Sequence, residues 1–154
     1  MVLGEGGHTT EMLRIAEGLK PTYHYSYLVP KHDHISETKI RIAGPIYRAN
    51  LPRAKSPSLL NTLKYLFLCT FQELVILLKV RPKVVMSAGA GIAVPVSVFG
   101  WLFGVKIIYI ESATRVQTLS LSGKILYPIA HLFFVQWPLL KEKYPKAIYA
   151  GRLV

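Results

Sequence analysis

Short apolar runs rich in valine, isoleucine and tyrosine alternate with longer apolar patterns of helical spacing along this chain. The alternation is typical of β-α-β units, because two parallel strands of one sheet need a long crossover that is usually a helix. We therefore predict strands at residues 2–3, 23–29, 45–49, 83–87, 105–110, 132–136 and 147–149. A first helix is predicted to follow an N-terminal cap at Thr9 or Thr10. Further helices are predicted at residues 59–79, 92–103, 122–130 and 138–143.

A single α/β domain with a parallel sheet is the predicted fold class for residues 1–154. The composition is 51% apolar and 18% charged, which excludes a disordered tail. The run at residues 83–87 has the continuous apolar character of a strand buried on both faces. The strand at residues 2–3 is shorter than the about 5–6 residues of a usual strand. Either the natural start lies upstream, or something else completes the sheet.

Lysine and arginine outnumber aspartate and glutamate by 19 to 8, which gives a formal net charge of +11. This balance favours an anionic partner: nucleic acid, a phospholipid surface or a phosphorylated substrate. The only cysteine, Cys69, cannot form an intramolecular disulfide, which favours a reducing, cytosolic setting. Asp33 is the only aspartate, so this chain by itself cannot form a D-x-D cluster that holds a divalent metal.

Two apolar stretches, residues 59–80 and 92–110, are long enough to raise the question of membrane contact. Charged side chains interrupt the first, and Pro95 and Gly100 the second, so neither reads as a spanning helix of about 20 apolar residues. Residues 38–72 carry basic side chains and no acidic one. Basic residues beside an apolar helix favour contact with an anionic lipid surface over a plain core role. The basic residues are Lys39, Arg41, Arg48, Arg53, Lys55 and Lys64, and the predicted membrane contacts are Leu63, Phe67, Phe71, Phe99, Trp101 and Phe103.

Three segments follow predicted strands at their carboxyl ends: residues 4–9, 87–91 and 111–115. Ligands of an open parallel sheet bind at that edge. The first two segments are glycine turns, whose amides can approach a phosphate closely because glycine has no Cβ. A tight strand-to-helix turn is the alternative interpretation. The candidate residues for binding a phosphate-bearing ligand are Gly4, Gly6, Gly7, Thr9, Ser87, Gly89, Gly91, Ser112 and Arg115.

His8 and Glu111 are the candidate catalytic residues. An imidazole beside an anion-binding loop can act as a general base, although a single histidine is often structural. Glu111 closes an apolar strand, where an unpaired carboxylate is costly, so we expect it either to pair with Arg115 or to face the ligand. Residues 32–34, His-Asp-His, have no further metal ligands nearby in sequence, so we predict a solvated loop there and no metal site.

Residues 4–9, Gly-Glu-Gly-Gly-His-Thr, resemble the G-S-G-G-H-T loop of the asparagine-linked-glycosylation subunit-fourteen family, with Glu5 in place of the serine. At His131 the family commonly has an aspartate. The resemblance covers nearly the whole chain, and bacterial exopolysaccharide subunits of the PssD type are similar over the same motifs. The other motifs that carry it lie at residues 87–95, 109–112, 115–124, 134–137, 143–146 and 151–154.

The resemblance implies a Rossmann-like sheet with helices on both faces, the amino-terminal half of a GT-B glycosyltransferase, similar to the acceptor-binding domain of MurG. It implies a subunit of an N-acetylglucosaminyltransferase in lipid-linked oligosaccharide synthesis for N-glycosylation. That enzyme transfers N-acetylglucosamine from UDP-N-acetylglucosamine to a polyprenyl- or dolichyl-diphosphate-linked N-acetylglucosamine. The resemblance places it at the cytosolic face of a membrane, without a metal or other cofactor.

The resemblance also implies a heterodimer with a small donor-binding subunit that is recruited to the membrane, so that this chain alone is not expected to be active. His8 is then the base for the acceptor hydroxyl, while Glu111 and Arg115 orient a phosphate of the acceptor or donor. The residues implied in docking the partner are Gly151, Arg152, Leu153 and Val154.

Three alternatives stay open from the sequence. The first is a role in exopolysaccharide assembly, because that pathway needs nearly the same acceptor surface. The second is a non-catalytic membrane scaffold for a self-sufficient partner enzyme. The charge of +11 also fits a nucleic-acid-binding module, but the sequence shows no reading helix or base-stacking platform, so we predict no nucleic-acid partner.

Overall fold

The computed structural model describes residues 1–19, 22–52 and 59–153. Helices and strands alternate along this part of the chain, as the sequence predicts. The helices are α1 (Gly7–Leu19), α2 (Ile35–Thr38), α3 (Leu59–Val80), α4 (Ala93–Leu102), α5 (Leu121–Leu126) and α6 (Pro138–Lys143). The strands are β1 (Tyr27–Pro30), β2 (Ile46–Ala49), β3 (Val84–Ala88), β4 (Lys106–Ile110), β5 (Leu132–Val135) and β6 (Ile148–Tyr149).

The strands form one parallel sheet that is joined at its centre by the first residues of the chain. β1 pairs with β2, while β3, β4, β5 and β6 pair in that order. Val2 makes parallel bridges to Leu28 of β1 and to Ser87 of β3. The Val2 amide donates to the carbonyl oxygen of Met86 at 2.8 Å, and the Leu3 amide donates to that of Leu28 at 2.8 Å. The short predicted strand at residues 2–3 therefore lies in the middle of the sheet, where the strand order reverses.

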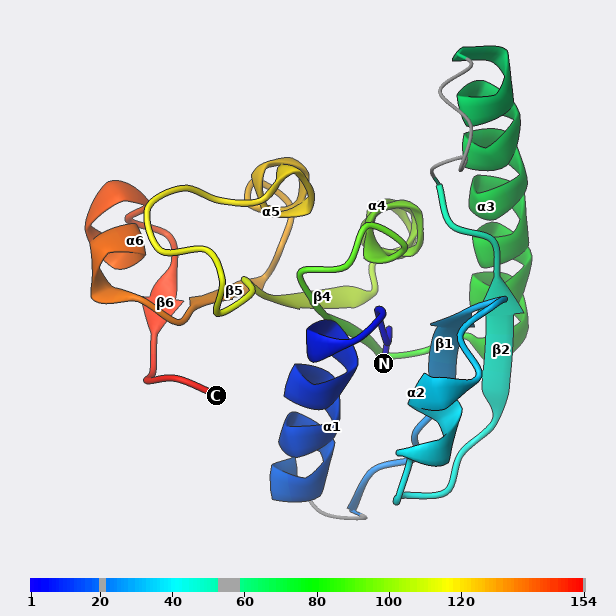
Figure 1. The fold of residues 1–154 in the computed structure, drawn as a ribbon, viewed down its shortest axis with the longest axis horizontal. Helices are drawn as coiled ribbons and strands as arrows, with labels where there is room; N and C mark the ends of the chain where they lie inside the picture. The colour runs from blue at the N-terminus through cyan, green and yellow to red at the C-terminus, as the bar shows by residue number, and fades with distance from the viewer. Residues whose placement is uncertain (20–21, 53–58, 154) are drawn as a thin grey trace.

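Helices cover both faces of the sheet, which confirms the predicted fold class. Figure 1 shows α4 and α5 on one side of the strands and α1 on the other. The larger buried cluster joins α3, α4 and α5 to alternate residues of the central strands, among them Val85, Ile107 and Phe133. The second cluster packs Met12 and Leu13 of α1 against the opposite face. This inward alternation on both faces is what a doubly covered parallel sheet requires.

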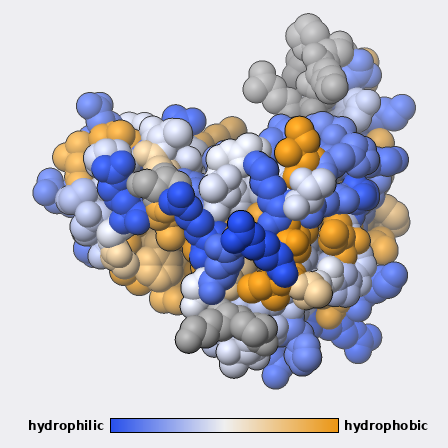
Figure 2. All heavy atoms as spheres, turned by 60° about the horizontal axis from the view of Figure 1, so that its bottom comes forward, coloured by the Kyte–Doolittle hydropathy of each residue, from blue (hydrophilic) through white to orange (hydrophobic). Residues whose placement is uncertain are grey.

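The face that carries α1 is less completely covered. Val84 and Leu132, the first residues of β3 and β5, are exposed, and Met86 is half-buried. Figure 2 looks at the molecule from this side and shows hydrophobic patches between hydrophilic residues. The prediction that the strand at residues 83–87 is buried on both faces is therefore wrong for its first half, because α1 packs beside only part of it.

Other differences from the predicted elements are local. α1 begins at Gly7, so Thr9 and Thr10 lie inside the helix and do not cap it. The strand predicted at residues 23–29 is observed as β1, which starts later in the chain and is shorter. The one-turn helix α2 lies where neither a helix nor a strand is predicted. The long predicted helix at residues 59–79 is confirmed by α3, and the helix at residues 138–143 is confirmed by α6.

A buried carboxyl group joins α3 to α4. Glu73 of α3 is fully buried, and its Oε2 accepts a hydrogen bond of 2.6 Å from the Val96 amide. That amide belongs to the first turn of α4, so the carboxyl group connects the two helices directly. The Cys69 thiol donates to Oε1 at 3.0 Å. Burial raises the pKa of Glu73 to about 8, against the opposing effect of these two hydrogen bonds.

We expect Glu73→Gln to remove a pH dependence of stability. The raised pKa means that the folded state keeps a proton that the unfolded chain has released, so the contribution of Glu73 is fully present below about pH 4.5 and is lost as the pH rises through about 8. Glutamine keeps the acceptor for Val96 without the charge. The variant should unfold at a higher temperature than the parent at pH 9, with a gain of a few kcal/mol, since one pKa unit corresponds to about 1.4 kcal/mol.

Thermal unfolding between pH 5 and pH 9 checks this expectation. Glu142→Gln is the matched control, because Glu142 is exposed on α6. Equal pH slopes for the parent and Glu73→Gln would contradict the assignment.

Candidate functional site

The two glycine turns meet around the side chain of His8. A Cβ atom at Gly89 would lie 2.7 Å from His8 Cε1, and one at Gly4 would lie 2.9 Å from His8 Cβ. Real Cβ atoms do not approach other atoms so closely, so both positions need glycine. Gly89 also has φ +62°, a conformation that glycine adopts without strain. The predicted turns after the first strand and after β3 therefore form a slot for the imidazole.

His8 lies partly open within this slot. Its side chain is 34% exposed, while its Nδ1 atom is buried. The Nδ1 side of the ring faces Gly89 and lies 3.7 Å from Glu11 Oε2. The Nε2 side is thus the side that can meet a ligand. This orientation suits a general base, whose basic nitrogen must reach a proton on the substrate.

The candidate phosphate-binding residues divide into exposed and buried ones. Gly6, Gly7, Gly91 and Arg115 are exposed, and Gly6 and Gly7 lead into the amino end of α1, where free amides favour an anion. Gly4 is buried and Gly89 half-buried against the His8 ring. The remaining three are buried in their turns, which argues against direct contact between their side chains and a ligand: Thr9, Ser87 and Ser112.

Thr9 has a structural contact instead. Its hydroxyl donates to the Gly4 carbonyl oxygen and lies 2.7 Å from Ser36 Oγ, so it ties the first glycine turn to α2. Ser112 Oγ lies 3.1 Å from Thr114 Oγ1 within the turn after β4. The Ser87 hydroxyl is buried and has no hydrogen-bond partner among the described residues.

Glu111 is fully buried and holds the loop that follows β4. Its Oε1 accepts from the Ser112 amide at 3.0 Å, and its Oε2 accepts from the Ser120 amide at 2.9 Å. Burial raises the pKa of Glu111, although these bonds and the charge of Arg115 act in the opposite direction. Arg115 is exposed and does not hydrogen-bond the carboxylate. The expected pairing with Arg115 is therefore not a direct contact, and Glu111 orders the loop from inside. The expectation that it faces the ligand stays a prediction.

Two buried polar side chains near His8 were not among the predicted site residues. Glu11 lies one helical turn after His8, and this i,i+3 spacing is a signal that could have identified it. Gln136 follows β5 and donates to Glu11 Oε1 at 3.0 Å. The two residues are 125 positions apart in the chain, so no local pattern could have joined them.

The C-terminal tail packs beside this site. The Leu153 amide donates to Gln136 Oε1 at 2.8 Å, and its carbonyl oxygen accepts from Arg14 of α1. The Arg152 guanidinium lies 4.4 Å from the centre of the Trp137 ring. Gly151 has φ +96° and is exposed, while Val154 lies outside the described residues. The predicted docking role of this tail stays a prediction.

Most of the predicted membrane contacts lie on the surface of α3 and at the end of α4. The exposed ones are Leu63, Phe67, Phe71, Trp101 and Phe103. Phe99 is half-buried and packs against the larger core cluster, which makes it unsuited to lipid contact. Arg53 and Lys55 lie outside the described residues. None of the helices described here has the length and apolar character that crossing a bilayer requires.

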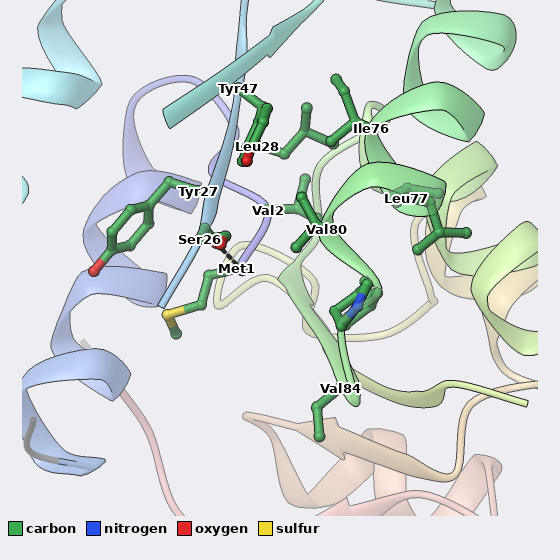
Figure 3. A pocket seen from close by; sticks show the side chains of 13 residues that line it. Met1, Val2, Ser26, Tyr27, Leu28, Tyr47, Ile76, Leu77, Val80 and Val84 are labelled. Carbon is green, nitrogen blue, oxygen red and sulfur yellow. Dashed lines mark hydrogen bonds between the residues drawn. The ribbon is translucent and has the colours of Figure 1, made fainter. Parts of the chain in front are cut away.

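A small apolar cavity lies at the opposite edge of the sheet. It measures about 50 Å³ and is bordered by Met1, Val2, Leu28, Leu77 and Val84, among others. Figure 3 shows Met1, Val2 and Leu28 near the hydrogen bond of 2.6 Å from the Met1 nitrogen to the Ser26 carbonyl oxygen, with Leu77 and Val84 farther from it. Val84 begins β3, whereas Gly89 follows its end, so this cavity is separate from the His8 slot.

Residues 32–34 do not form a metal site. His32 pairs with Glu5, and Asp33 accepts a hydrogen bond of 2.9 Å from the Ser36 amide. Across the described ranges, no three side chains of His, Cys, Asp or Glu gather closely enough to hold a metal ion.

Comparison with known proteins identifies the relatives of this chain. The family described as "Oligosaccharide biosynthesis protein Alg14 like" matches residues 1–153. The mouse UDP-N-acetylglucosamine transferase subunit ALG14 is 37% identical over 177 residues, which cover 100% of this chain and 82% of the mouse protein. The human subunit of the same name is 36% identical, and the match covers 100% of this chain and 82% of the human protein. The subunit of Candida albicans is 36% identical, and the match covers 77% of its length.

Solved structures share the fold at low sequence identity. MurG from Acinetobacter baumannii superposes with a TM-score of 0.71 at 17% identity, over 100% of this chain and 43% of that one. UDP-GlcNAc 2-epimerase from Methanocaldococcus jannaschii gives a TM-score of 0.69 at 16% identity, over 98% of this chain and 44% of that one. The chain thus spans less than half the length of these two proteins.

We expect Gly89→Ala to displace the His8 ring, because the added methyl group would overlap it. Gly104→Ala is the matched control: Gly104 also has a positive φ of +77°, but a Cβ there meets nothing within 4 Å. Both variants should lose stability by about 1–2 kcal/mol from backbone strain. Only Gly89→Ala should change the ring resonances of His8 in NMR spectra. Identical His8 resonances in the two variants would show that the slot does not constrain the ring.

Proposed function

Because the chain belongs to the Alg14-like family of oligosaccharide biosynthesis proteins, we propose that it is the acceptor-binding subunit of a UDP-N-acetylglucosamine transferase. Its acceptor is a lipid-diphosphate-linked N-acetylglucosamine, and the reaction belongs to lipid-linked oligosaccharide synthesis for N-glycosylation. The observation that carries this proposal is the position of His8, held between two glycine turns where the order of strands reverses. Ligands of open α/β sheets bind at that point.

A partner subunit completes the site in this proposal. The relatives named above are subunits of a UDP-N-acetylglucosamine transferase, which supports a second, donor-binding protein that binds most of the nucleotide sugar. The exposed tail residues Gly151 and Arg152 lie near the carboxyl edge of the sheet and are available for docking that protein. In this proposal neither subunit alone holds both substrates, so activity requires the heterodimer.

The chemistry assigned to this chain is acceptor binding and proton removal. Amides at the start of α1 and the Arg115 guanidinium balance the negative charge of the diphosphate. His8 Nε2 takes the proton of the acceptor hydroxyl while the oxygen of that hydroxyl attacks the anomeric carbon of the donor sugar. The bond from that carbon to UDP breaks, and UDP leaves with the electron pair. We propose that the reaction needs no divalent metal, in keeping with the single aspartate of this chain.

Membrane attachment follows from the surface of α3 and the end of α4. Exposed Leu63, Phe67 and Phe71 form an apolar surface on one long helix, and the chain carries a net charge of +11. Apolar side chains that enter the interface, together with basic ones that meet anionic headgroups, bind a protein to a bilayer without a spanning segment. The proposed location is the cytosolic face of a membrane.

We expect His8→Ala to lower turnover by the assembled heterodimer by roughly 10²–10⁴-fold, which is the usual contribution of a general base. The measurement is transfer of labelled N-acetylglucosamine to the lipid-linked acceptor. His24→Ala, on the loop before β1, is the control and should leave the rate unchanged. Near-normal turnover by His8→Ala would refute the base assignment and favour a scaffold that only anchors the partner.

We expect Leu63→Ser combined with Phe67→Ser to weaken binding to vesicles of phosphatidylcholine and phosphatidylserine. Burial of each such side chain stabilises by about 1.5–3 kcal/mol, so the partition coefficient should fall roughly tenfold or more for each one. Co-sedimentation measures the effect. Ile35→Ser removes an equally exposed apolar side chain from α2 and serves as the control. Equal losses of vesicle binding in the double α3 variant and in Ile35→Ser would argue against α3 as the membrane-facing element.

A further inference from the structure

His8 and Glu11 form a polar pair on the first two turns of α1, and the two atoms that face each other are buried. His8 Nδ1 and Glu11 Oε2 are 3.7 Å apart, and neither atom has a hydrogen-bond partner among the described residues. Leaving such atoms unpaired in a buried site is costly. Each is the nearest complement of the other, since neutral imidazole can donate from Nδ1 and a carboxylate can only accept. In the absence of substrate, hydrogen bonds between catalytic groups are often long, and they shorten when substrate binds.

Glu11 is fixed from its other oxygen. Its Oε1 accepts from the Ala113 amide at 2.9 Å and from Gln136 Nε2 at 3.0 Å, which leaves Oε2 facing the imidazole. Burial acts to raise the pKa of Glu11, but the interaction with His8 and the hydrogen bonds from Ala113 and Gln136 outweigh it, and the pKa lies below its usual range. The carboxylate is therefore ionised beside His8 at neutral pH.

Gln136 connects this carboxylate to the C-terminal tail. Its Nε2 donates both to Glu11 Oε1 and to the Glu111 carbonyl oxygen, the latter at 3.1 Å. Its Oε1 accepts from the Leu153 amide at 2.8 Å. The amide group is thus held at both ends. Movement of the tail removes the partner of Oε1, so that the side chain that contacts Glu11 is held through Nε2 alone.

We infer that Glu11 is the positioning residue of His8, and that Gln136 makes this positioning depend on whether Leu153 is bound to it. A hydrogen bond from His8 Nδ1–H to Glu11 selects the neutral tautomer whose free electron pair is on Nε2, and it directs Nε2 at the acceptor hydroxyl. When Nε2 takes the proton of that hydroxyl, the adjacent carboxylate stabilises the imidazolium that forms. The inference rests on the proposed role of His8 as the base, and it links proton removal to the tail assigned to the partner subunit.

Glu11→Gln tests the inference with little change of shape. The variant keeps an oxygen for Ala113 and Gln136, but it places an NH₂ group against His8 Nδ1. That donor selects the opposite tautomer, in which Nε2 carries the proton and cannot act as a base. We expect kcat of the assembled heterodimer to fall roughly 10- to 100-fold, with KM for the acceptor changed by less than about threefold.

Glu17→Gln is the matched control, because Glu17 lies on the same helix, is partly exposed and pairs with an exposed arginine, Arg41. It should leave kcat, KM and thermal unfolding unchanged. A merely structural role for Glu11 would lower stability and affect kcat and KM together. Equal kcat in Glu11→Gln and Glu17→Gln would overturn the positioning role.

The ¹⁵N chemical shifts of the His8 ring provide a readout that does not depend on catalysis. We expect protonation at Nδ1 in the parent complex and at Nε2 in Glu11→Gln. Removal of residues 153–154 from the isolated chain should reduce the population protonated at Nδ1 relative to the intact isolated chain. An unchanged ring spectrum after this truncation would refute the link through Gln136.

These results separate the two hypotheses. Normal turnover by His8→Ala refutes the base assignment whatever the ring spectra show. Loss of turnover by His8→Ala together with an unchanged tautomer in Glu11→Gln refutes only the role of Glu11.

Discussion

The pairing of Val2 and Leu3 with strands on both sides is the interaction on which the rest of the structure depends. Through it, the pair β1–β2 and the four strands β3 to β6 become one sheet. The same pairing places the turn after Leu3 directly beside the turn after β3. Two glycine turns that are more than 80 positions apart in sequence thereby enclose a single imidazole. A two-residue strand suffices because it is hydrogen-bonded along both edges and buried on both faces.

From this central position a network of buried polar groups extends to the end of the chain. Glu111 orders the loop after β4, and Glu11 holds the amide of Ala113 within that loop. Gln136 joins both to Leu153. Buried carboxylates are costly unless hydrogen-bonded, and here each accepts bonds from backbone amides that would otherwise lie unpaired. The network explains why a domain with only eight acidic residues keeps two of them buried beside its candidate site.

Helix α3 has one buried side and one exposed apolar side. α3 buries Cys69, Glu73 and Leu77 against α4 and the sheet, while Phe67 and Phe71 remain exposed on the same helix. A helix with an apolar side turned outward needs a second apolar environment, and a lipid interface supplies one to a chain of this charge. The proposed enzyme is thus assembled from three surfaces: the sheet edge for the acceptor, α3 for the membrane and the tail for the donor subunit.

Local sequence determined the order and type of most elements, since the alternation of apolar runs and the glycine turns depend on neighbouring residues only. It also identified His8, Gly4 and Gly89, because glycine beside a strand end has a direct conformational meaning. It could not show that Glu111 and Thr9 face inward, nor that Phe99 packs on the core, because burial depends on what other segments cover. The pairing of Glu11 with Gln136 was likewise decided by tertiary structure alone. Only the assembled sheet brings α1, β5 and the tail together. A hydrogen bond between residues 125 positions apart leaves no trace in local spacing.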